Sequence, residues 1–341
     1  MNARFFTTVT AAVAVIGLAL SACSTDTAPA AGGSGTKPSV SKRGDLKIAY
    51  FSAGANNSYL QASIDEAKKT AKDMGAELDV FDGQFSAQVQ FDQIQNALTS
   101  GKYNSFAVEP NDGNLVCDVL TKTAPEKKIM VSVFNLPICG RATKSGKQTW
   151  EPGTVTYVGG QTLDVYDEWV ESVKKENPNG GKIALISGPD LNANSICFFK
   201  AAQAFKKEDG FEVVAKQTTD YSTPKAFSAA QTISRAKPDL DIVMSNFSGM
   251  TRGVVSALGG KPAKVYDFGG DEWALKNVSS GNLAQSVMML PRNETREALE
   301  ALGDHAEGKD VPHFINLTES DDLPGTPFAT KKNVADFTAQ Y

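Results

Sequence analysis

The sequence predicts an α/β protein made of two doubly wound parallel-sheet lobes joined by a hinge. From Leu46 onward, short apolar strands alternate with amphipathic helices, which is typical of parallel sheets covered by helices on both faces. The chain has 341 residues, enough for two domains, and it contains more strand–helix units than one compact sheet holds. The glycine-rich turn at 158–160 is a natural place for the chain to pass to a second sheet.

The first half contains short apolar runs, each of which predicts a strand. After the strand at 46–51, apolar residues recur from Leu60 to Met74 at steps of four, three, four and three, which places them on one helical face. The other expected strands are 77–81, 105–109, 129–134 and 154–158; the other helices are 86–100 and one through Val116 and Leu120, and a polar loop spans 140–153.

The same alternation resumes after residue 160. The expected helices are 162–176, 195–207, 224–236, 250–258, a short one after residue 271, and 294–307; the expected strands are 182–187, 211–216, 241–245, 264–268 and 283–290. We therefore assign 45–158 and 290–316 to the N-terminal lobe, and 159–289 and 317–341 to the C-terminal lobe. The path of the last segment is left open.

The first 22 residues are typical of a signal peptide. Arg4 is followed by an apolar run at 11–20, and ten residues are too few to span a bilayer, which takes about 20. The run leads into Leu-Ser-Ala-Cys at 20–23, which resembles the lipobox of bacterial lipoproteins. This resemblance implies cleavage before Cys23 and a lipid, such as palmitate, on that residue. The alternative is an ordinary secretory signal with an incidental cysteine.

Residues 23–44 then form a flexible tether, because they are rich in Ser, Thr, Ala, Gly and Pro and lack apolar periodicity. No later stretch is apolar enough to cross a membrane. We expect an extracytoplasmic protein that is anchored to the cell membrane by the lipid on Cys23.

Export to an oxidising compartment allows one disulfide among the remaining cysteines. Cys117 and Cys139 lie in adjacent elements, a helix and the loop after the next strand, and we favour this pair, with Cys197 left over. The alternative is three buried thiols, since free cysteine packs well as a small apolar residue. His305 and His313 are the only histidines, and no cysteine pair has zinc-finger spacing, so no metal site is expected.

Composition and motifs exclude several classes of function. The net charge of −5 with mixed signs disfavours nucleic-acid binding, which needs a basic face. The chain has no P-loop, no G-x-G-x-x-G at a strand-to-helix turn and no G-x-S-x-G, so we expect no cofactor and no catalytic residues. Glu109 and Asp271 could form a glycosidase carboxylate pair, but this signal is weak because binding proteins also use carboxylates as sugar acceptors.

The residues that follow the expected strands are candidates for binding a small ligand, because ligands of doubly wound sheets bind beyond the carboxyl ends of the strands. Amides and carboxylates form directional hydrogen bonds to hydroxyl groups, and aromatic faces pack on sugar rings. Asn and Asp also cap helices, and we interpret Asp82 and Asn194 in that way. Aromatic residues at the same strand ends favour binding. The candidates are Asn57, Tyr59, Glu109, Phe134, Asn135, Asn246, Phe247, Asp271, Trp273 and Met289.

From Leu46 to the C-terminus, the chain resembles the bacterial extracytoplasmic solute-binding proteins of the ribose-binding (type I periplasmic) kind, which serve ABC importers. The stretch from Lys47 to Leu78 is similar to that family's opening strand and helix, which implies ligand contacts by Asn57 and Tyr59. The stretch from Ser245 resembles the family's N-D-x-x-A-x-G turn and carries over Asn246. Asp-Phe-Gly-Gly-Asp at 267–271 resembles G-F-D-G and carries over Asp271.

The sequence also departs from that family's pattern. Ser58 replaces a proline, Glu109 an amide, Phe247 an acid and Met289 a glutamine; Phe134 and Asn135 stand where sugar binders often have Asp-Arg. The second lobe has no clear counterpart of an expected arginine in its first helix. These changes imply a site that is less polar and more acidic than a ribose site.

The resemblance implies a monomeric, lipid-anchored substrate-binding subunit of an ABC importer. It would capture a small sugar or polyol by hinge closure and deliver it to the permease, without cofactor or metal. A ligand-sensing receptor of the same fold is one alternative, and an amine or a nucleoside is an alternative ligand. A transcription repressor is disfavoured because an export signal stands where a DNA-binding helix pair would be.

Overall fold

The computed structural model describes residues 40–341. The predicted signal peptide, Cys23 and most of the tether lie outside the described residues. Within the described part, no helix combines the length and apolar character needed to cross a bilayer. The predicted pair of α/β lobes is confirmed: the strands form two six-stranded sheets.

The first lobe is built on an all-parallel sheet with the strand order β11-β5-β4-β3-β1-β2. Its four inner strands are buried on both faces, which is why they read as continuous apolar runs, whereas the two edge strands are only partly buried. They are β1 (Lys47–Ser52), β2 (Glu77–Asp82), β3 (Ser105–Val108), β4 (Met130–Phe134), β5 (Thr156–Gly159) and β11 (Phe314–Asn316).

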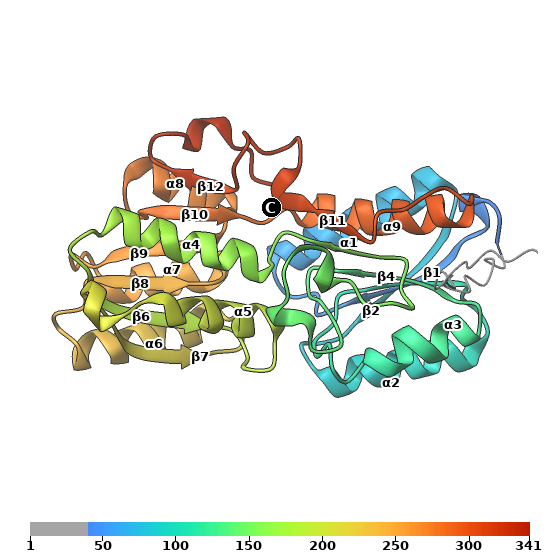
Figure 1. Cartoon of the computed structure of the whole chain (residues 1–341), viewed down its shortest axis with the longest axis horizontal. Helices are drawn as coiled ribbons and strands as arrows, with labels where there is room; N and C mark the ends of the chain where they lie inside the picture. Colours follow the sequence, from blue (N-terminus) through green and yellow to red (C-terminus); the bar gives the residue numbers. More distant parts are fainter. Residues whose placement is uncertain (1–39) are drawn as a thin grey trace, which may run out of the picture. The chain divides into compact units, whose positions relative to one another are not determined.

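Helices cover both faces of this sheet (Figure 1). On one face, α1 (Ser58–Met74) lies beside α9 (Pro291–Ala306), and Ala71 and Leu302 join the same apolar core. On the other face lie α2 (Ala87–Ser100) and α3 (Ala124–Glu126), the latter preceded by a π-helical turn at Val119–Thr123.

The second lobe has the strand order β12-β10-β9-β8-β6-β7, parallel except for β12, which pairs antiparallel with β10. The strands are β6 (Gly181–Ser187), β7 (Phe211–Thr218), β8 (Ile242–Ser245), β9 (Lys264–Gly269), β10 (Gln285–Met288) and β12 (Phe328–Thr330). The helices are α4 (Leu163–Glu176), α5 (Ala193–Ala201), α6 (Thr223–Ala236), α7 (Ser248–Leu258) and α8 (Glu272–Ser280).

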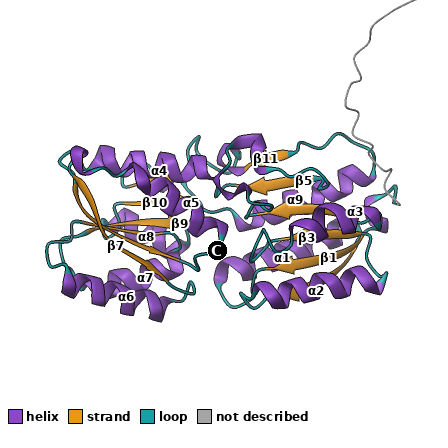
Figure 2. Cartoon of the chain, turned by 60° about the horizontal axis from the view of Figure 1, so that its bottom comes forward, coloured by secondary structure: helices purple, strands orange, loops and turns teal. Residues whose placement is uncertain are grey.

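Helices α4 and α5 lie on one face of this second sheet, and α6 and α7 lie on the other (Figure 2). The fully buried rings of Tyr166 and Trp169 on α4 pack against Phe268 of β9, with ring centroids 4.6 and 5.5 Å apart. The amphipathic character of α4 in the sequence therefore reflects a face that packs on the sheet.

The chain passes three times between the lobes. The crossings lie between β5 and α4, between β10 and α9, and between β11 and β12. The chain therefore changes from one sheet to the other at about residues 159, 290 and 317. The short edge strands β11 and β12 were not predicted, because three residues are too few to show an alternating pattern.

The cysteines occupy two kinds of environment. Cys117 and Cys139 form a disulfide that joins the turn before the π-helical segment to the loop after β4. Cys197 on α5 is a buried free thiol, and its sulfur donates a hydrogen bond to the carbonyl oxygen of Ala142 at 2.8 Å. Ala142 belongs to the first lobe, so this thiol lies at a contact between the two lobes.

Candidate functional site

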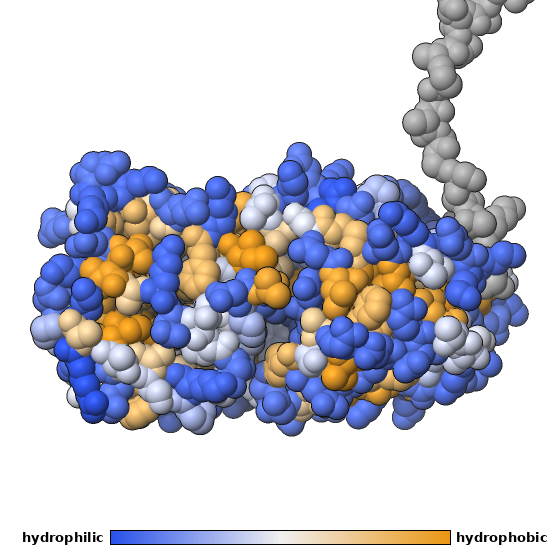
Figure 3. All heavy atoms as spheres, turned by 90° about the horizontal axis from the view of Figure 1, so that it is seen from below, coloured by the Kyte–Doolittle hydropathy of each residue, from blue (hydrophilic) through white to orange (hydrophobic). Residues whose placement is uncertain are grey.

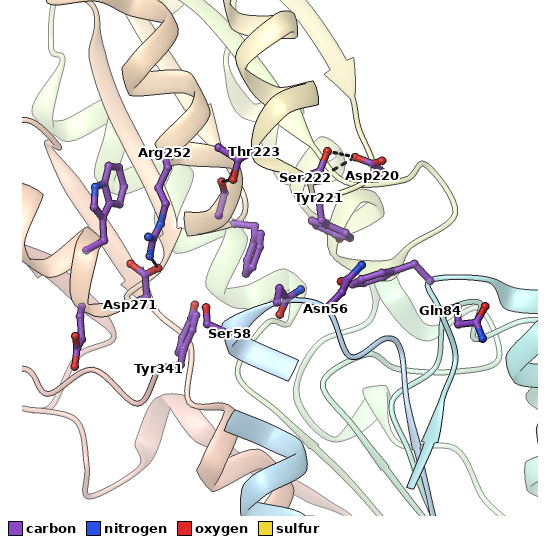
Figure 4. Close-up of a pocket in the computed structure, with 16 residues that line it drawn as sticks. Asn56, Ser58, Gln84, Asp220, Tyr221, Ser222, Thr223, Arg252, Asp271 and Tyr341 are labelled. Atoms are coloured by element: carbon purple, nitrogen blue, oxygen red, sulfur yellow. Dashed lines mark hydrogen bonds and ion pairs between the residues drawn. The ribbon is translucent and has the colours of Figure 1, made fainter. Parts of the chain in front are cut away.

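Loops that follow the strands of both sheets line two adjoining cavities. An inner cavity of about 40 Å³ lies beside an outer cleft of about 810 Å³, whose lining residues are shown in Figure 4. The two share the lining residues Asn57, Phe85, Tyr221 and Phe247, and we call the place where these four residues lie the passage.

The inner cavity contains polar atoms that have no partner. Asn246 directly follows β8 and is fully buried, yet neither its amide oxygen nor its amide nitrogen forms a hydrogen bond. The amide oxygen of buried Asn194 on α5 is also unpaired. Because a buried polar group without a partner costs about 1–3 kcal/mol, these atoms mark a place where a ligand would supply the missing bonds.

A chain of hydrogen bonds runs from the first lobe to the second along this cavity. Asn135 donates to a carboxylate oxygen of Glu109 at 2.6 Å, Gln161 donates to Asn135 at 2.6 Å, and Asn194 donates to Gln161 at 2.6 Å. Gln161 belongs to the crossing between β5 and α4. The chain therefore couples a carboxyl group after β3 to the first turn of α5.

Two buried carboxyl groups have raised pKa values. Burial raises the pKa of Glu109 to about 7, even though the hydrogen bond from Asn135 opposes the change. Burial also raises the pKa of Glu294 on α9 to about 8, opposed by a hydrogen bond from the hydroxyl of Tyr59. Both groups therefore change charge near neutral pH.

Two candidate residues also act as helix caps. The side chain of Asn57 accepts a hydrogen bond from the backbone N–H of Leu60 at 2.9 Å and caps α1. Asp271 caps α8 through the N–H of Ala274 at 2.7 Å, and its other oxygen pairs with Arg252. The carboxylate of Asp271 is thus already engaged on both oxygens.

Aromatic rings from both lobes meet at the passage. The rings of Phe85, in the loop after β2, and Tyr221, after β7, have centroids 6.1 Å apart, and the ring of Phe247 lies 5.8 Å from Tyr221. Phe85 and Tyr221 both have left-handed backbones, with φ of 52° and 65°. Such conformations are uncommon for bulky residues and concentrate at functional sites.

The outer cleft contains an ion pair and aromatic rings that lie close to it (Figure 4). Arg252 on α7 reaches Asp271, and its guanidinium lies 5.3 Å from the ring centre of Trp273. The ring of Tyr341 meets Tyr59 edge-on at 5.4 Å, and its hydroxyl donates to the carbonyl of Gly269. Within the described residues, no His, Cys, Asp and Glu side chains gather in a group of three that could hold a metal ion.

The structure brings nine of the ten candidates to these cavities. The inner one is lined by Asn57, Tyr59, Glu109, Asn135, Asn246, Phe247 and Met289, and the outer one also by Asp271 and Trp273. Phe134 lines neither. Its ring stacks on Tyr50 in the core at 5.3 Å, because consecutive residues of a strand point in opposite directions and Asn135 takes the cavity side.

Sequence reasoning missed several lining residues. Asn194 was interpreted as a helix cap, but the cap of α5 is Asn192, and this shift places Asn194 at the cavity. Tyr221 stands three residues beyond β7, where the rule that selected the other strand ends would have found it. Phe85 lies in the turn after β2, while Arg252 and Tyr341 had no signal in the sequence that pointed to the cleft.

Comparisons with known proteins agree with this architecture. The ribose import binding protein of Bacillus subtilis is 23% identical over 286 residues, which cover 82% of this chain and 88% of that protein. The D-allose-binding periplasmic protein of Escherichia coli is 27% identical over 256 residues, covering 71% and 79%. These relatives are binding proteins, in line with the expectation of a protein that is not an enzyme.

Solved structures show the same fold. A solute-binding protein of an ABC transporter from Bacillus halodurans with bound myo-inositol is 20% identical, with a TM-score of 0.74 over 87% of this chain and 99% of that one. Another from Mycobacterium smegmatis with bound glycerol is 25% identical, with a TM-score of 0.72 over 85% and 96%. The model of one family, described as the periplasmic binding protein domain, matches residues 48–310. This range includes most of both lobes and most of the cavity residues. The chain therefore belongs to this family of extracytoplasmic binding proteins.

Proposed function

We propose that the protein captures a small sugar or polyol between its two lobes and delivers it to the permease of an ABC importer. The observation that carries this proposal is the fully buried amide of Asn246, which has no hydrogen-bond partner on either atom. An amide offers one acceptor and two donors, which matches the mixed donor and acceptor character of hydroxyl groups.

Ligand capture by lobe closure is supported by the origin of the lining residues. Glu109 and Asn135 come from the first lobe, whereas Asn194 and Asn246 come from the second. A ligand that contacts both sets has extra affinity for the arrangement in which the lobes approach each other, and it shifts the population toward that state. The permease would then read the closed shape.

The test is a thermal-shift and calorimetric screen of the purified protein against sugars, polyols and nucleosides. A ligand at 100 times its Kd should add about 2.7 kcal/mol of stability. In Asn246→Leu, the apolar side chain should leave the unliganded protein at least as stable while the ligand-induced shift disappears. Asn179→Ala, an exposed amide far from the cavities, is the matched control. A ligand that still stabilises the Asn246→Leu variant as much as the wild-type protein would contradict the proposed site.

We also propose that Cys23 carries the lipid anchor and that the protein acts as a monomer. The lipobox-like stretch at 20–23 supports the anchor. Figure 3 shows one face of the protein, with hydrophilic side chains around its edges and apolar ones in patches along its middle. Cys23→Ala should move the protein from the membrane to the soluble extracytoplasmic fraction and abolish labelling by radioactive palmitate. Membrane retention of this variant would refute the anchor.

A further inference from the structure

The amide chain beside the inner cavity has a fixed direction. When Glu109 is ionised, its carboxylate only accepts hydrogen bonds, so it requires Asn135 to present its amide nitrogen. The oxygen of Asn135 is then left to accept from Gln161, and the oxygen of Gln161 to accept from Asn194. Glu109 therefore sets the orientation of all three amides, which would otherwise be ambiguous.

This direction determines what the far end of the chain offers to a ligand. The nitrogen of Asn194 is used by Gln161, so the atom left without a partner is its oxygen, an acceptor. On the opposite lobe, the second carboxylate oxygen of Glu109 accepts a long hydrogen bond of 3.4 Å from the backbone N–H of Ala53, and the hydroxyl of Ser52 is a second donor to this carboxylate. Asn246 adds an unpaired amide oxygen and an unpaired amide nitrogen. Asn57 and Asn192, whose amide oxygens already accept hydrogen bonds, add amide nitrogens to the lining. The atoms that Glu109 and Asn194 offer to a ligand are therefore acceptors.

In its ionised form, Glu109 also gives the lining a negative charge that no neighbouring cation balances. Among residues 40–341, no Lys, Arg or His nitrogen lies within 4 Å of the Glu109 carboxylate, and Arg252 is paired with Asp271 in the outer cleft. Four aromatic residues surround the inner cavity: Tyr59, Phe85, Tyr221 and Phe247. Aromatic faces attract cations, and the attraction grows where water is excluded.

Together these features call for a ligand group that donates several hydrogen bonds and is positively charged. A neutral hydroxyl brings a single donor, whereas an ammonium group brings three and no acceptor. We propose that the natural ligand is a sugar or polyol that carries a protonated amino group, which binds in the inner cavity between Glu109 and the amide oxygen of Asn194. This inference rests on the proposed capture of a sugar or polyol and specifies its chemical class.

The test compares amines with their neutral parents by titration calorimetry on the purified protein. The two pairs are D-glucosamine with D-glucose, and 1-amino-1-deoxy-D-sorbitol with D-sorbitol. In the wild-type protein, each amine should bind at least about tenfold more tightly than its parent, the value of one charge-assisted hydrogen bond. In Glu109→Gln, this preference, taken as the ratio of the two affinities, should fall to about threefold or less.

Two further variants make the result specific. Glu66→Gln removes another buried carboxyl group, which lies on α1 outside both cavities and has Lys69 and Arg292 within 4 Å. This variant should keep the preference for the amines. Asn194→Leu removes the acceptor on the second lobe and leaves Glu109 in place; it should also reduce the preference, which covers the case in which Glu109→Gln does not fold.

The outcomes separate this inference from the proposed function. Neutral parents that bind as tightly as the amines, or a preference that persists in both Glu109→Gln and Asn194→Leu, would overturn the inference and leave sugar capture intact. If the amines, their parents and the wider panel of sugars and polyols all fail to bind, both proposals are overturned.

Discussion

Single residues at the cavity combine full burial with incomplete hydrogen bonding. Asn246 is buried without a hydrogen-bond partner, and Glu109 and Glu294 are buried carboxyl groups that form no salt bridge with any residue among 40–341. Each of these features lowers stability relative to an apolar residue that packs equally well. Such residues are expected where binding, rather than folding, determines the side chain.

The raised pKa of Glu294 predicts a pH-dependent stability. Its pKa is 4.5 in an ordinary environment and about 8 in the folded protein, so folding takes up a proton between these pH values. The free energy of unfolding should therefore fall, by up to a few kcal/mol, as the pH rises from about 5 to 8. Urea unfolding at pH 5.5 and pH 8 measures this change.

The variant Glu294→Gln should reduce this pH dependence, since the glutamine side chain does not titrate; Glu109, whose pKa is also raised, contributes to the part that remains. Glu66→Gln is the matched control, because it replaces another buried carboxyl group, one that pairs with Lys69 at 3.4 Å. An unaltered slope in Glu294→Gln would show that other groups cause the effect.

A second prediction at this scale concerns Asp271, which both caps α8 and pairs with Arg252. Asp271→Asn keeps an oxygen that can accept from the N–H of Ala274, whereas Asp271→Ala removes the cap and should cost about 1 kcal/mol more. Chemical unfolding of both variants measures the difference. Equal losses would mean that the pair with Arg252, and not the cap, contributes the stability.

At the scale of elements, turns and short connections position the site more than the helices and strands do. Phe85 and Tyr221 reach the passage from turns with left-handed backbones, after β2 and β7. In the first lobe, the disulfide between Cys117 and Cys139 joins two segments that are 22 residues apart in sequence. It restricts the long irregular stretch around the π-helical turn.

Loop-closure entropy predicts the effect of removing this disulfide. Opening a loop of 22 residues should cost about 3 kcal/mol, so Cys117→Ser combined with Cys139→Ser should lower Tm by several degrees. A reductant should lower the Tm of the wild-type protein similarly and leave the double variant unchanged. Cys197→Ala should remain sensitive to the reductant. A wild-type Tm that is insensitive to reduction would contradict the prediction.

At the scale of the whole molecule, the two lobes are linked by crossing segments that also organise the cavity. Gln161 lies in the first crossing and lines neither cavity, yet it bonds to Asn135 of one lobe and Asn194 of the other. Its removal would leave amides in both lobes without partners. The segment thus links lobe geometry to the polarity of the binding site.

Gln161→Leu should therefore weaken ligand binding by about tenfold without any direct contact with the ligand. Calorimetry with any ligand found in the screen measures the change. Gln285→Leu, a substitution of another buried glutamine on β10 away from both cavities, should leave affinity unchanged. Wild-type affinity in Gln161→Leu would show that the amides of Asn135 and Asn194 are held in place without it.

The sequence predicted the two lobes, and nine of its ten candidate residues line the cavities, for a simple reason. Parallel strands bring their carboxyl ends to one edge, so polar and aromatic residues such as Asn246 and Phe247 after β8 can be located from the strand pattern alone. Phe134 and Asn194 show the limit of that reasoning. A shift of one or two residues decides which side a residue faces, and local patterns leave strand and helix ends uncertain by about that much.

Tyr341 and Arg252 show a different limit. Tyr341 reaches the cleft only after the chain has formed β12 on the second sheet, and Arg252 only through the position of α7. Their places depend on long-range packing, which sequence periodicity does not encode.

The rate at which the buried thiol of Cys197 reacts reports how often the two lobes separate. Burial raises its pKa to about 12, so almost no reactive thiolate exists at neutral pH while the thiol remains against Ala142. A disulfide reagent such as dithiodipyridine can reach the sulfur only during excursions that part α5 from the loop after β4. Cys117 and Cys139 are already joined in a disulfide, and Cys23 can be acylated or replaced. The absorbance of the thiol that the reagent releases then measures the reaction of Cys197, and no engineered label is needed. A bound ligand that holds the lobes together should lower the reaction rate of Cys197.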